Sequence, residues 1–336
     1  MVENPLKSKN LSRRRALQIV AAVAAFPKSA LSKTNPQIPV TWRGTALGAD
    51  AAISLYHPNQ KAADRLINLC VAEVRRLESL FSLFDTGSSI SVLNREGRLE
   101  QPASDLVALL KQSQHVGNMT DGAFDVTVQP LWQLFARHFS HENPDPAGPT
   151  RIDIEQARSL VDYRALKINA DRVRFQKEGM AITLNGIAQG FITDRVADLL
   201  KAGGVDRVLV DMGELRGVGR HPDERPWRIG LIDPLSPGAF SQTIDLDDRA
   251  VASSGGYGTP FGAEGLHHHL FDPKTGVSAV YHAGITVIAP TATMADALST
   301  GFAALPLDDI RAVVQGLDHV TAIITQADGT IVELSS

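Results

Sequence analysis

Small and polar residues gather in one segment that could hold a ligand through its backbone. Asn185, Gly186 and Gly190 lie at a turn, where glycine lets another group come close. Apolar residues at helical spacing follow, and Gly203-Gly204 ends that pattern. The free N–H groups and the dipole at the start of a helix attract an anion. The spacing is not that of a Rossmann fingerprint, so the segment predicts either an anion site or an ordinary structural turn.

A carboxylate and a hydroxyl lie at helical spacing near the C-terminal end of the chain. Asp296 and Thr300 are four residues apart in a helical pattern, so they share one face of the helix. Oxygen ligands of this kind suit a hard cation. The alternative is a solvated helix start in which the threonine bonds to the local backbone.

Two further segments combine aromatic, small and polar residues. Phe124 and Asp125 follow a glycine, which suits either stacking and hydrogen bonding to an aromatic ring or a loop-to-strand junction with a core phenylalanine. Ser254 and Gly255 lie where a strand runs into a glycine-rich turn. That turn suits a phosphate or a ribose, and equally an ordinary loop.

Three consecutive histidines, His267 to His269, suggest a transition metal. Consecutive side chains on a strand point to opposite faces, however, which disfavours their binding one ion together. A single histidine that acts as a general base near Asp272 fits the pattern better, because imidazole titrates near neutral pH.

Composition limits the classes of protein to which the chain can belong. It has 336 residues, of which 43% are hydrophobic and 21% charged, as is ordinary for a globular protein. The net charge is −4 and no stripe of lysine and arginine occurs, so we expect no nucleic-acid partner. Cys70 is the single cysteine, which excludes an intramolecular disulfide, and its apolar helical neighbours predict a core position.

The N-terminus has the pattern of an export signal. Arg13, Arg14 and Arg15 precede a modestly apolar run over 16–26, too short to span a bilayer, and then small residues. The arginines and the alanine-rich run favour the twin-arginine route, and hence a periplasmic protein with residues 1–32 as its signal. Retention of that segment as an anchor and a basic, disordered N-terminus of a cytosolic protein are the alternatives.

Hydrophobic periodicity places the candidate residues on interspersed helices and strands. Helices are predicted over 60–81, 104–120 and 293–305, and between Gly190 and Gly203. Strands are predicted over 40–56 with a turn at Gly48, and over 165–175, 180–184, 207–210, 227–232, 242–246, 250–253, 283–288, 320–325 and 330–334. No steady β-α-β rhythm appears, so the pattern favours an α+β fold over a doubly wound sheet.

In this order the motifs resemble the ApbE family, the FAD:protein FMN transferases, over nearly the whole chain from Thr41 onward. The resemblance rests on Arg43–Thr45, Phe81–Asp85 with Ser88, Ser91 and Asn94, Gly122–Thr127, Gly186–Gly190 with Asp194, Asp211–Gly213, Ala252–Gly255, His269–Gly276 and Ala295–Thr300. It implies one domain over 33–336, built of mixed, mainly antiparallel sheets with flanking helices.

The resemblance also implies an activity. FAD is the substrate and Mg²⁺ the metal, and the FMN half passes to a Thr or Ser hydroxyl in an attachment motif of an acceptor flavoprotein, with release of AMP. His269 corresponds to the family's base, and Asp272 lies beside it in the motif. Asp296, Thr300 and a backbone carbonyl at Gly186 would bind Mg²⁺. Residues of the nucleotide site would be Arg43, Phe84, Ala123, Phe124, Asp125, Thr183, Gln189, Ser254, Gly255 and Leu270.

Three positions depart from the common family pattern, and one of them is Arg43, which stands where a methionine is usual. Thr183 and Gln189 stand where an aspartate and a lysine are usual, so an acidic and a basic group are missing near the nucleotide. The Thr183–Gly190 form, together with Asp211–Glu214, resembles an exported, NosX-type subgroup that serves nitrous oxide reductase by flavinylating a membrane partner. This implies a peripheral contact with such a partner. The alternatives are an FAD pyrophosphatase and a non-catalytic flavin-binding assembly protein.

Overall fold

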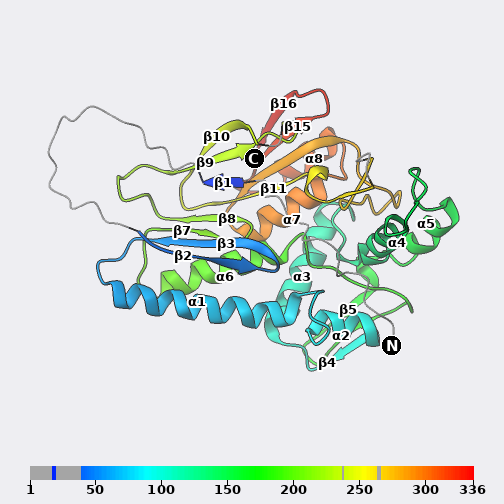
Figure 1. Cartoon of the computed structure of the whole chain (residues 1–336), viewed down its shortest axis with the longest axis horizontal. Coiled ribbons are helices and arrows are strands. Elements are labelled where there is room, and N and C mark those ends of the chain that lie inside the picture. Colours follow the sequence, from blue (N-terminus) through cyan, green and yellow to red (C-terminus); the bar gives the residue numbers. More distant parts are fainter. Residues whose placement is uncertain (1–16, 20–38, 237, 263–265) are drawn as a thin grey trace.

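The computed structural model describes residues 17–19, 39–236, 238–262 and 266–336 (Figure 1). The predicted export signal over 1–32, with its arginines, therefore lies outside the described residues except for 17–19. Within the described part, no helix combines the length and the apolar character needed to cross a membrane.

A large antiparallel sheet forms the centre of the molecule. Its strand order is β16-β15-β14-β11-β8-β7-β3-β2, and each neighbouring pair is antiparallel. The strands are β2 (Val40–Ala46), β3 (Ala49–Leu55), β7 (Val208–Asp211), β8 (Leu215–Val218), β11 (Ala250–Ser254), β14 (His282–Ala289), β15 (Thr321–Gln326) and β16 (Ile331–Ser335). The pairing brings β8 and β11 side by side, although 31 residues separate Val218 from Ala250 along the chain.

Three helices pack on one face of this sheet and enclose the main core (Figure 1). They are α1 (Gln60–Phe81), α6 (Ala188–Ala202) and α7 (Ala292–Phe302). Helix α6 contacts α7, β7 and β8, and α7 contacts β11 and β14. The starts of α6 and α7 therefore meet over the centre of the sheet, where polar residues collect.

A smaller sheet covers the opposite face. It consists of β9 (Trp227–Ile232), β10 (Phe240–Leu246) and β1 (Leu17–Ile19), in the order β1-β9-β10. Trp227, Ile229 and Leu231 form a second core with apolar residues of β7, β8 and β11. The central strands are thus buried on both faces, as their apolar composition requires.

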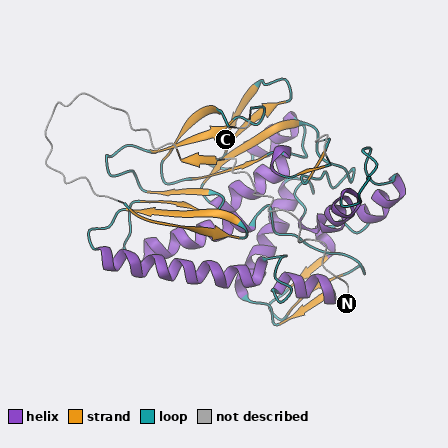
Figure 2. Ribbon diagram, in the orientation of Figure 1, coloured by secondary structure: helices purple, strands orange, loops and turns teal. Residues whose placement is uncertain are grey.

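The remaining elements flank the helical side (Figure 2). They are the helices α2 (Ser89–Glu96), α3 (Ser104–Met119), α4 (Gln129–Phe139), α5 (Arg151–Arg158) and α8 (Leu307–Gln315), and the strands β4 (Arg98–Glu100), β5 (Leu166–Ile168), β6 (Arg172–Phe175), β12 (Pro260–Phe261) and β13 (His267–His268). An aromatic cluster that includes Phe135, Phe261 and Phe271 joins α4 to the β12–β13 hairpin.

The predicted α+β class, with mainly antiparallel sheets and flanking helices, is confirmed. The helix predicted over 60–81 is also confirmed, as α1. Asn59 caps its start, because the Asn59 side chain accepts a hydrogen bond from the N–H of Ala62. Cys70 is buried in the core as expected.

The predicted strand over 180–184 is wrong. Its central residue bonds to a side chain instead of a neighbouring strand, since Ile182 donates its N–H to Asn94 Oδ1 (2.7 Å) and its carbonyl accepts from Asn94 Nδ2 (2.8 Å). The chain does turn before this segment, at 176–179, and the strand predicted over 165–175 is divided at 169–171 into β5 and β6.

Candidate functional site

The start of α6 lies directly against α7, and two glycines make this contact. A Cβ on Gly190 would collide with the backbone of Ala292, and one on Gly186 would lie 2.7 Å from Thr300 Oγ1. Any larger residue at either position would force the two segments apart. The glycine-rich turn predicted to hold a ligand is therefore also needed for packing.

Asp296, Thr300 and Gly186 come together at this contact, as the sequence predicts. Asp296 is 4% exposed, and its Oδ2 accepts a hydrogen bond from the N–H of Gly190 at 2.9 Å. The Asp296 carboxylate thus lies at the start of α6, where the helix dipole favours a negative charge. Thr300 is one turn further along α7 and lies against Gly186.

Strand β11 ends at the same place. Ser254 Oγ lies 2.8 Å from Ser299 Oγ and 3.4 Å from Thr300 Oγ1. The turn after Ser254 begins with Gly255, over which the ring of Tyr257 folds. These hydroxyl groups line the side of the site that faces the sheet.

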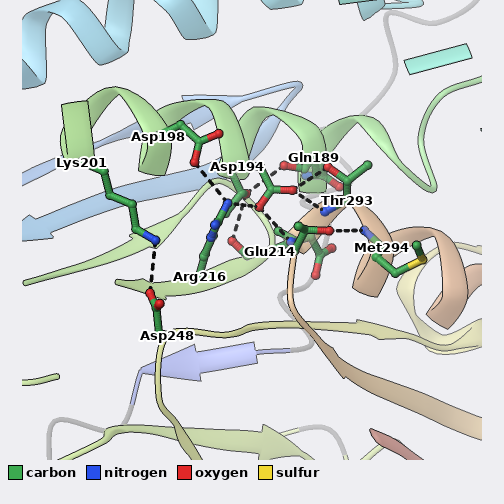
Figure 3. Close-up of polar contacts among 12 residues, drawn as sticks. Gln189, Asp194, Asp198, Lys201, Glu214, Arg216, Asp248, Thr293 and Met294 are labelled. Carbon is green, nitrogen blue, oxygen red and sulfur yellow. Dashed lines mark hydrogen bonds and ion pairs between the residues drawn. The ribbon is translucent and has the colours of Figure 1, made fainter. Parts of the chain in front are cut away.

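Asp194 of α6 holds the beginning of α7 in place (Figure 3). Its carboxylate accepts hydrogen bonds from the N–H groups of Ala292 (2.9 Å) and Thr293 (2.8 Å) and from Thr293 Oγ1 (2.6 Å). Arg216 Nη1 of β8 pairs with the same carboxylate at 2.6 Å. This network fixes the helix that carries Asp296 and Thr300 relative to the sheet.

The turn between β7 and β8 closes the inner end of the site. Gly213 has φ +104°, and the amide of Gln189 occupies the space where a Cβ would stand. Glu214 beside it is 8% exposed. Burial raises the pKa of Glu214 well above its usual value, and the nearby carboxylates of Asp296 and Asp211 raise it further.

The three histidines have separate environments. The ring of His267 lies 5.5 Å from that of Phe135 and 5.4 Å from that of Phe139. His268 Nε2 is 2.8 Å from the carbonyl oxygen of Ala279, and the ring of His269 lies beside Gly258. Among the described residues, no group of three or more His, Cys, Asp or Glu side chains could hold a metal ion.

Asp272 and Leu270 are engaged within the loop that carries His269. The Asp272 carboxylate accepts from the N–H of Lys274 (2.8 Å) and from Thr275 Oγ1 (3.0 Å), so it shapes the turn. Leu270 donates its N–H to His268 Nδ1 and accepts from the N–H of Ala279. The catalytic role of Asp272 and the nucleotide contacts of Leu270 stay predictions.

The Ala123–Asp125 segment is buried. Phe124 is 3% exposed and packs against Gly301 of α7, so it is a core residue, and the segment leads into a 3-10 helix at Val126–Val128 instead of a strand. The contacts of Ala123, Phe124 and Asp125 with a nucleotide stay predictions. Asp125 accepts from the N–H and Oγ1 of Thr127 and from the N–H of Tyr163. Burial nevertheless raises the pKa of Asp125 to about 6.

Asp125 also borders an open cleft of about 520 Å³. Four cationic side chains line this cleft, from Arg158, Arg164, Lys177 and Lys274. Lys274 pairs there with Asp121 at 2.9 Å. The carboxylates of Asp121, Asp125 and Asp162 line it as well, whereas Asp296, Thr300 and His269 are not among the lining residues. We base the candidate site on the α6–α7 contact, because the polar groups converge there.

Of three further predicted nucleotide residues, two are exposed and the third bonds to the residue that follows Asp125. Arg43 is exposed on the edge strand β2, and Phe84 is 71% exposed in the loop after α1. The N–H of Thr183 donates to the carbonyl of Val126 at 2.8 Å. Their roles in binding a nucleotide stay predictions.

Sequence analysis missed the parts that Asp194 and Glu214 play. Both occur in the motifs, but neither was given a role. The available signal was an acidic residue within or next to an apolar, buried element, where a carboxylate needs a partner.

A family model described as the ApbE family matches residues 47–324. The chain belongs to the ApbE family. The predicted family is thereby confirmed, whereas nothing distinguishes the NosX-type subgroup within it.

Curated relatives and solved structures of the ApbE family agree with this assignment. The FAD:protein FMN transferase of Haemophilus influenzae is 30% identical over 79% of this chain and 80% of its own length. That of Escherichia coli is 26% identical over 85% of this chain and 81% of its own length. The ApbE protein of Thermotoga maritima has a TM-score of 0.76 at 29% identity, over 88% of this chain and 97% of that one. The relatives thus carry the name of the enzyme class that the motifs predicted.

The ApbE site also fits the predicted cation. Mg²⁺ is commonly bound by one or two carboxylates together with substrate phosphates and water. Asp296, the Thr300 hydroxyl and the Gly186 carbonyl provide oxygen ligands of that kind, and Glu214 supplies a buried carboxylate oxygen that has no hydrogen-bond partner among the described residues. A cation placed here would offset this concentration of negative charge.

Proposed function

We propose that this chain transfers the FMN half of FAD to a Thr or Ser hydroxyl of an acceptor protein and releases AMP. The observation that carries the proposal is the convergence of Asp296, Thr300 and Gly186 at the start of α6, in a member of the ApbE family. The names of the relatives supply the reaction, and the side chains supply a site suited to a cation and a pyrophosphate.

The reaction divides into roles for residues of this chain. Bound Mg²⁺ would neutralise charge on the pyrophosphate while the P–O bond to AMP breaks. Asp296, Thr300 and the Gly186 carbonyl would hold that ion. His269 would take the proton of the acceptor hydroxyl, whose oxygen forms the new bond to the FMN phosphorus. Ser254 and the turn at Gly255 would position the phosphates through hydroxyl and N–H groups.

We further propose an exported, periplasmic enzyme whose acceptor belongs to a membrane flavoprotein linked to nitrous oxide reductase. This part rests on the arginine-containing N-terminus and on the Thr183–Gly190 form of the motif. The contact with the membrane partner would be peripheral.

The experiment that tests the transferase is intact-protein mass spectrometry of an acceptor domain with a threonine in an FMN-attachment motif. The acceptor is mixed with this chain, FAD and Mg²⁺, and we expect it to gain one FMN residue. EDTA, Asp296→Ala and His269→Ala should each lower the transfer rate about 100-fold or more, because each removes charge stabilisation or the base. Glu96→Gln, which changes an exposed carboxylate, is the matched control and should transfer normally.

Other outcomes of this experiment identify the alternatives. Free FMN and AMP without labelled acceptor would indicate an FAD pyrophosphatase. Tight FAD binding without turnover would indicate a flavin-binding assembly protein, a role that the missing charges at Thr183 and Gln189 would suit. Full transfer by Asp296→Ala would contradict the cation site.

A further inference from the structure

Glu214 is a buried carboxylate that the proposed mechanism leaves without a role. It is 8% exposed, and its Oε2 is a buried atom that has no hydrogen-bond partner among the described residues. A buried, unpaired carboxylate oxygen is costly unless a proton or a cation compensates it. The groups around Glu214 should therefore indicate whether a proton or a cation balances its charge.

Hydrogen bonds fix both the backbone and one carboxylate oxygen of Glu214. The Glu214 carbonyl accepts from Thr193 Oγ1 and from the N–H of Met212. Pairing between β8 and β11 stops at Leu215 and Val251. Beyond that point the N–H of Ser253 donates to the Glu214 carboxylate, which leaves only the second oxygen without a partner.

The position of Glu214 is close to the proposed cation ligands. Ser254, the residue after its hydrogen-bond donor, reaches Thr300 Oγ1 at 3.4 Å. Asp296 is near enough to act electrostatically on Glu214, and so is the ring hydroxyl of Tyr257. Glu214 directly precedes β8, so it lies on the sheet side of the α6–α7 contact.

The charges acting on Glu214 have the same sign as its own. Among the described residues, those that act on it are the carboxylates of Asp296 and Asp211. The neighbouring Gln189, whose amide packs against Gly213, is neutral. Arg216 is directed to Asp194 at 2.6 Å and balances that carboxylate instead. Within the described part of the chain, the charges that act on Glu214 are thus negative, and no cationic side chain balances them.

We propose that Glu214 and Asp296 share the divalent cation, so that Glu214 is a further residue of the metal site. The inference rests on the cation site of the proposed function. Two carboxylates, a hydroxyl and a carbonyl form an oxygen-rich set that leaves positions for water and substrate phosphate. The second carboxylate also strengthens cation binding in a site that lacks a lysine at position 189.

The test is a titration of the full chain with Mn²⁺ in the presence of FAD, followed by the electron paramagnetic resonance signal of free Mn²⁺. Mn²⁺ accepts the same oxygen ligands as Mg²⁺ and has a direct signal. We expect Glu214→Gln to weaken Mn²⁺ binding about tenfold or more, and Asp296→Ala to weaken it at least as much. Glu96→Gln should bind as the wild type does.

A second variant, Glu214→Asp, distinguishes the loss of the charge from a loss of structure. Glu214→Asp keeps the charge on a shorter side chain, so it should bind Mn²⁺ more tightly than Glu214→Gln. Thermal unfolding in EDTA should show one cooperative transition for both variants. If Glu214→Gln lowers affinity and Glu214→Asp restores part of it, charge rather than packing is responsible.

The failures are distinguishable. Unchanged Mn²⁺ affinity in a folded Glu214→Gln variant would overturn the inference, while FMN transfer and its dependence on Asp296 would remain intact. Equal loss of affinity in Glu214→Gln and Glu214→Asp would assign Glu214 a purely structural role and also overturn it. A wild-type chain that binds no Mn²⁺ would overturn both this inference and the cation site of the proposed function.

Discussion

At the scale of single residues, the main feature is a set of carboxylates buried beside the sheet and given different partners. Asp194 is compensated by Arg216 and by the N–H groups of α7. Asp125 is compensated by hydrogen bonds from Thr127 and Tyr163. Glu214 receives a single donor, from Ser253. The three carboxylates should therefore respond differently to substitution and to a cation.

The raised pKa of Asp125 predicts a specific pH dependence of stability. Its pKa is about 6 in the folded chain and 3.8 in the unfolded reference, so the folded state binds the proton more tightly. Stability from this group is fully present below 3.8 and is lost as pH rises through about 6. Between pH 7 and pH 4.5 the wild type should gain about 2 kcal/mol of unfolding free energy relative to Asp125→Asn. Urea unfolding of both proteins at the two pH values measures this; a difference that does not change with pH would contradict it.

At the scale of elements, the meeting of α6 and α7 depends on features from both helices and from the sheet. Glycines at 186 and 190 allow the close approach, and Asp194 caps α7 from the side of α6. Because Arg216 of β8 joins the same carboxylate, the two helices and the sheet are tied at one point. The positions of Asp296 and Thr300 follow from that junction.

Replacement of Asp194 tests this junction. Asp194→Ala removes three hydrogen bonds to the start of α7 and leaves Arg216 without its closest partner, so the unfolding free energy should fall by about 3–5 kcal/mol. Asp198→Ala is the matched control, because Asp198 lies 3.6 Å from Arg216 with its side chain 58% exposed. It should cost less than about 1 kcal/mol. Equal losses in urea unfolding for the two variants would show that Asp194 does not join these elements.

At the scale of the whole molecule, the candidate site lies between an antiparallel sheet and three helices, and the predicted export signal precedes these elements in the sequence. The twin-arginine route carries folded proteins. The candidate site is assembled from positions as distant as 186, 254 and 300, so it forms only when the chain is folded.

Export by that route predicts the effect of changes outside the domain. Replacement of Arg13 and Arg14 by lysine should leave the full-length precursor in the cytoplasm, because lysine keeps the charge but not the arginine pair of the signal. Fractionation followed by immunoblotting measures where the chain accumulates, with Arg95→Lys in the domain as a control. Normal export of the doubly substituted chain would contradict the twin-arginine route.

Much of the architecture could be predicted because local patterns encode it. The helix over 60–81 has an apolar face of regular spacing and a capping asparagine, and the strands before it flank a glycine with φ +79°. The segment over 180–184, by contrast, is not a strand although its local pattern predicts one. Its apolar residues satisfy a strand pattern, but its backbone bonds go to the side chain of Asn94, 88 residues earlier.

The sequence by itself determined the family, the α+β class and the identity of most polar residues at the site, because motif order and residue type are local properties. Only the tertiary structure decided how these residues are used. It buried Phe124 in the core, separated the three histidines and placed Glu214 beside the proposed cation ligands. The physical reason is that burial and charge compensation arise from contacts between residues far apart in the chain, which no local pattern records.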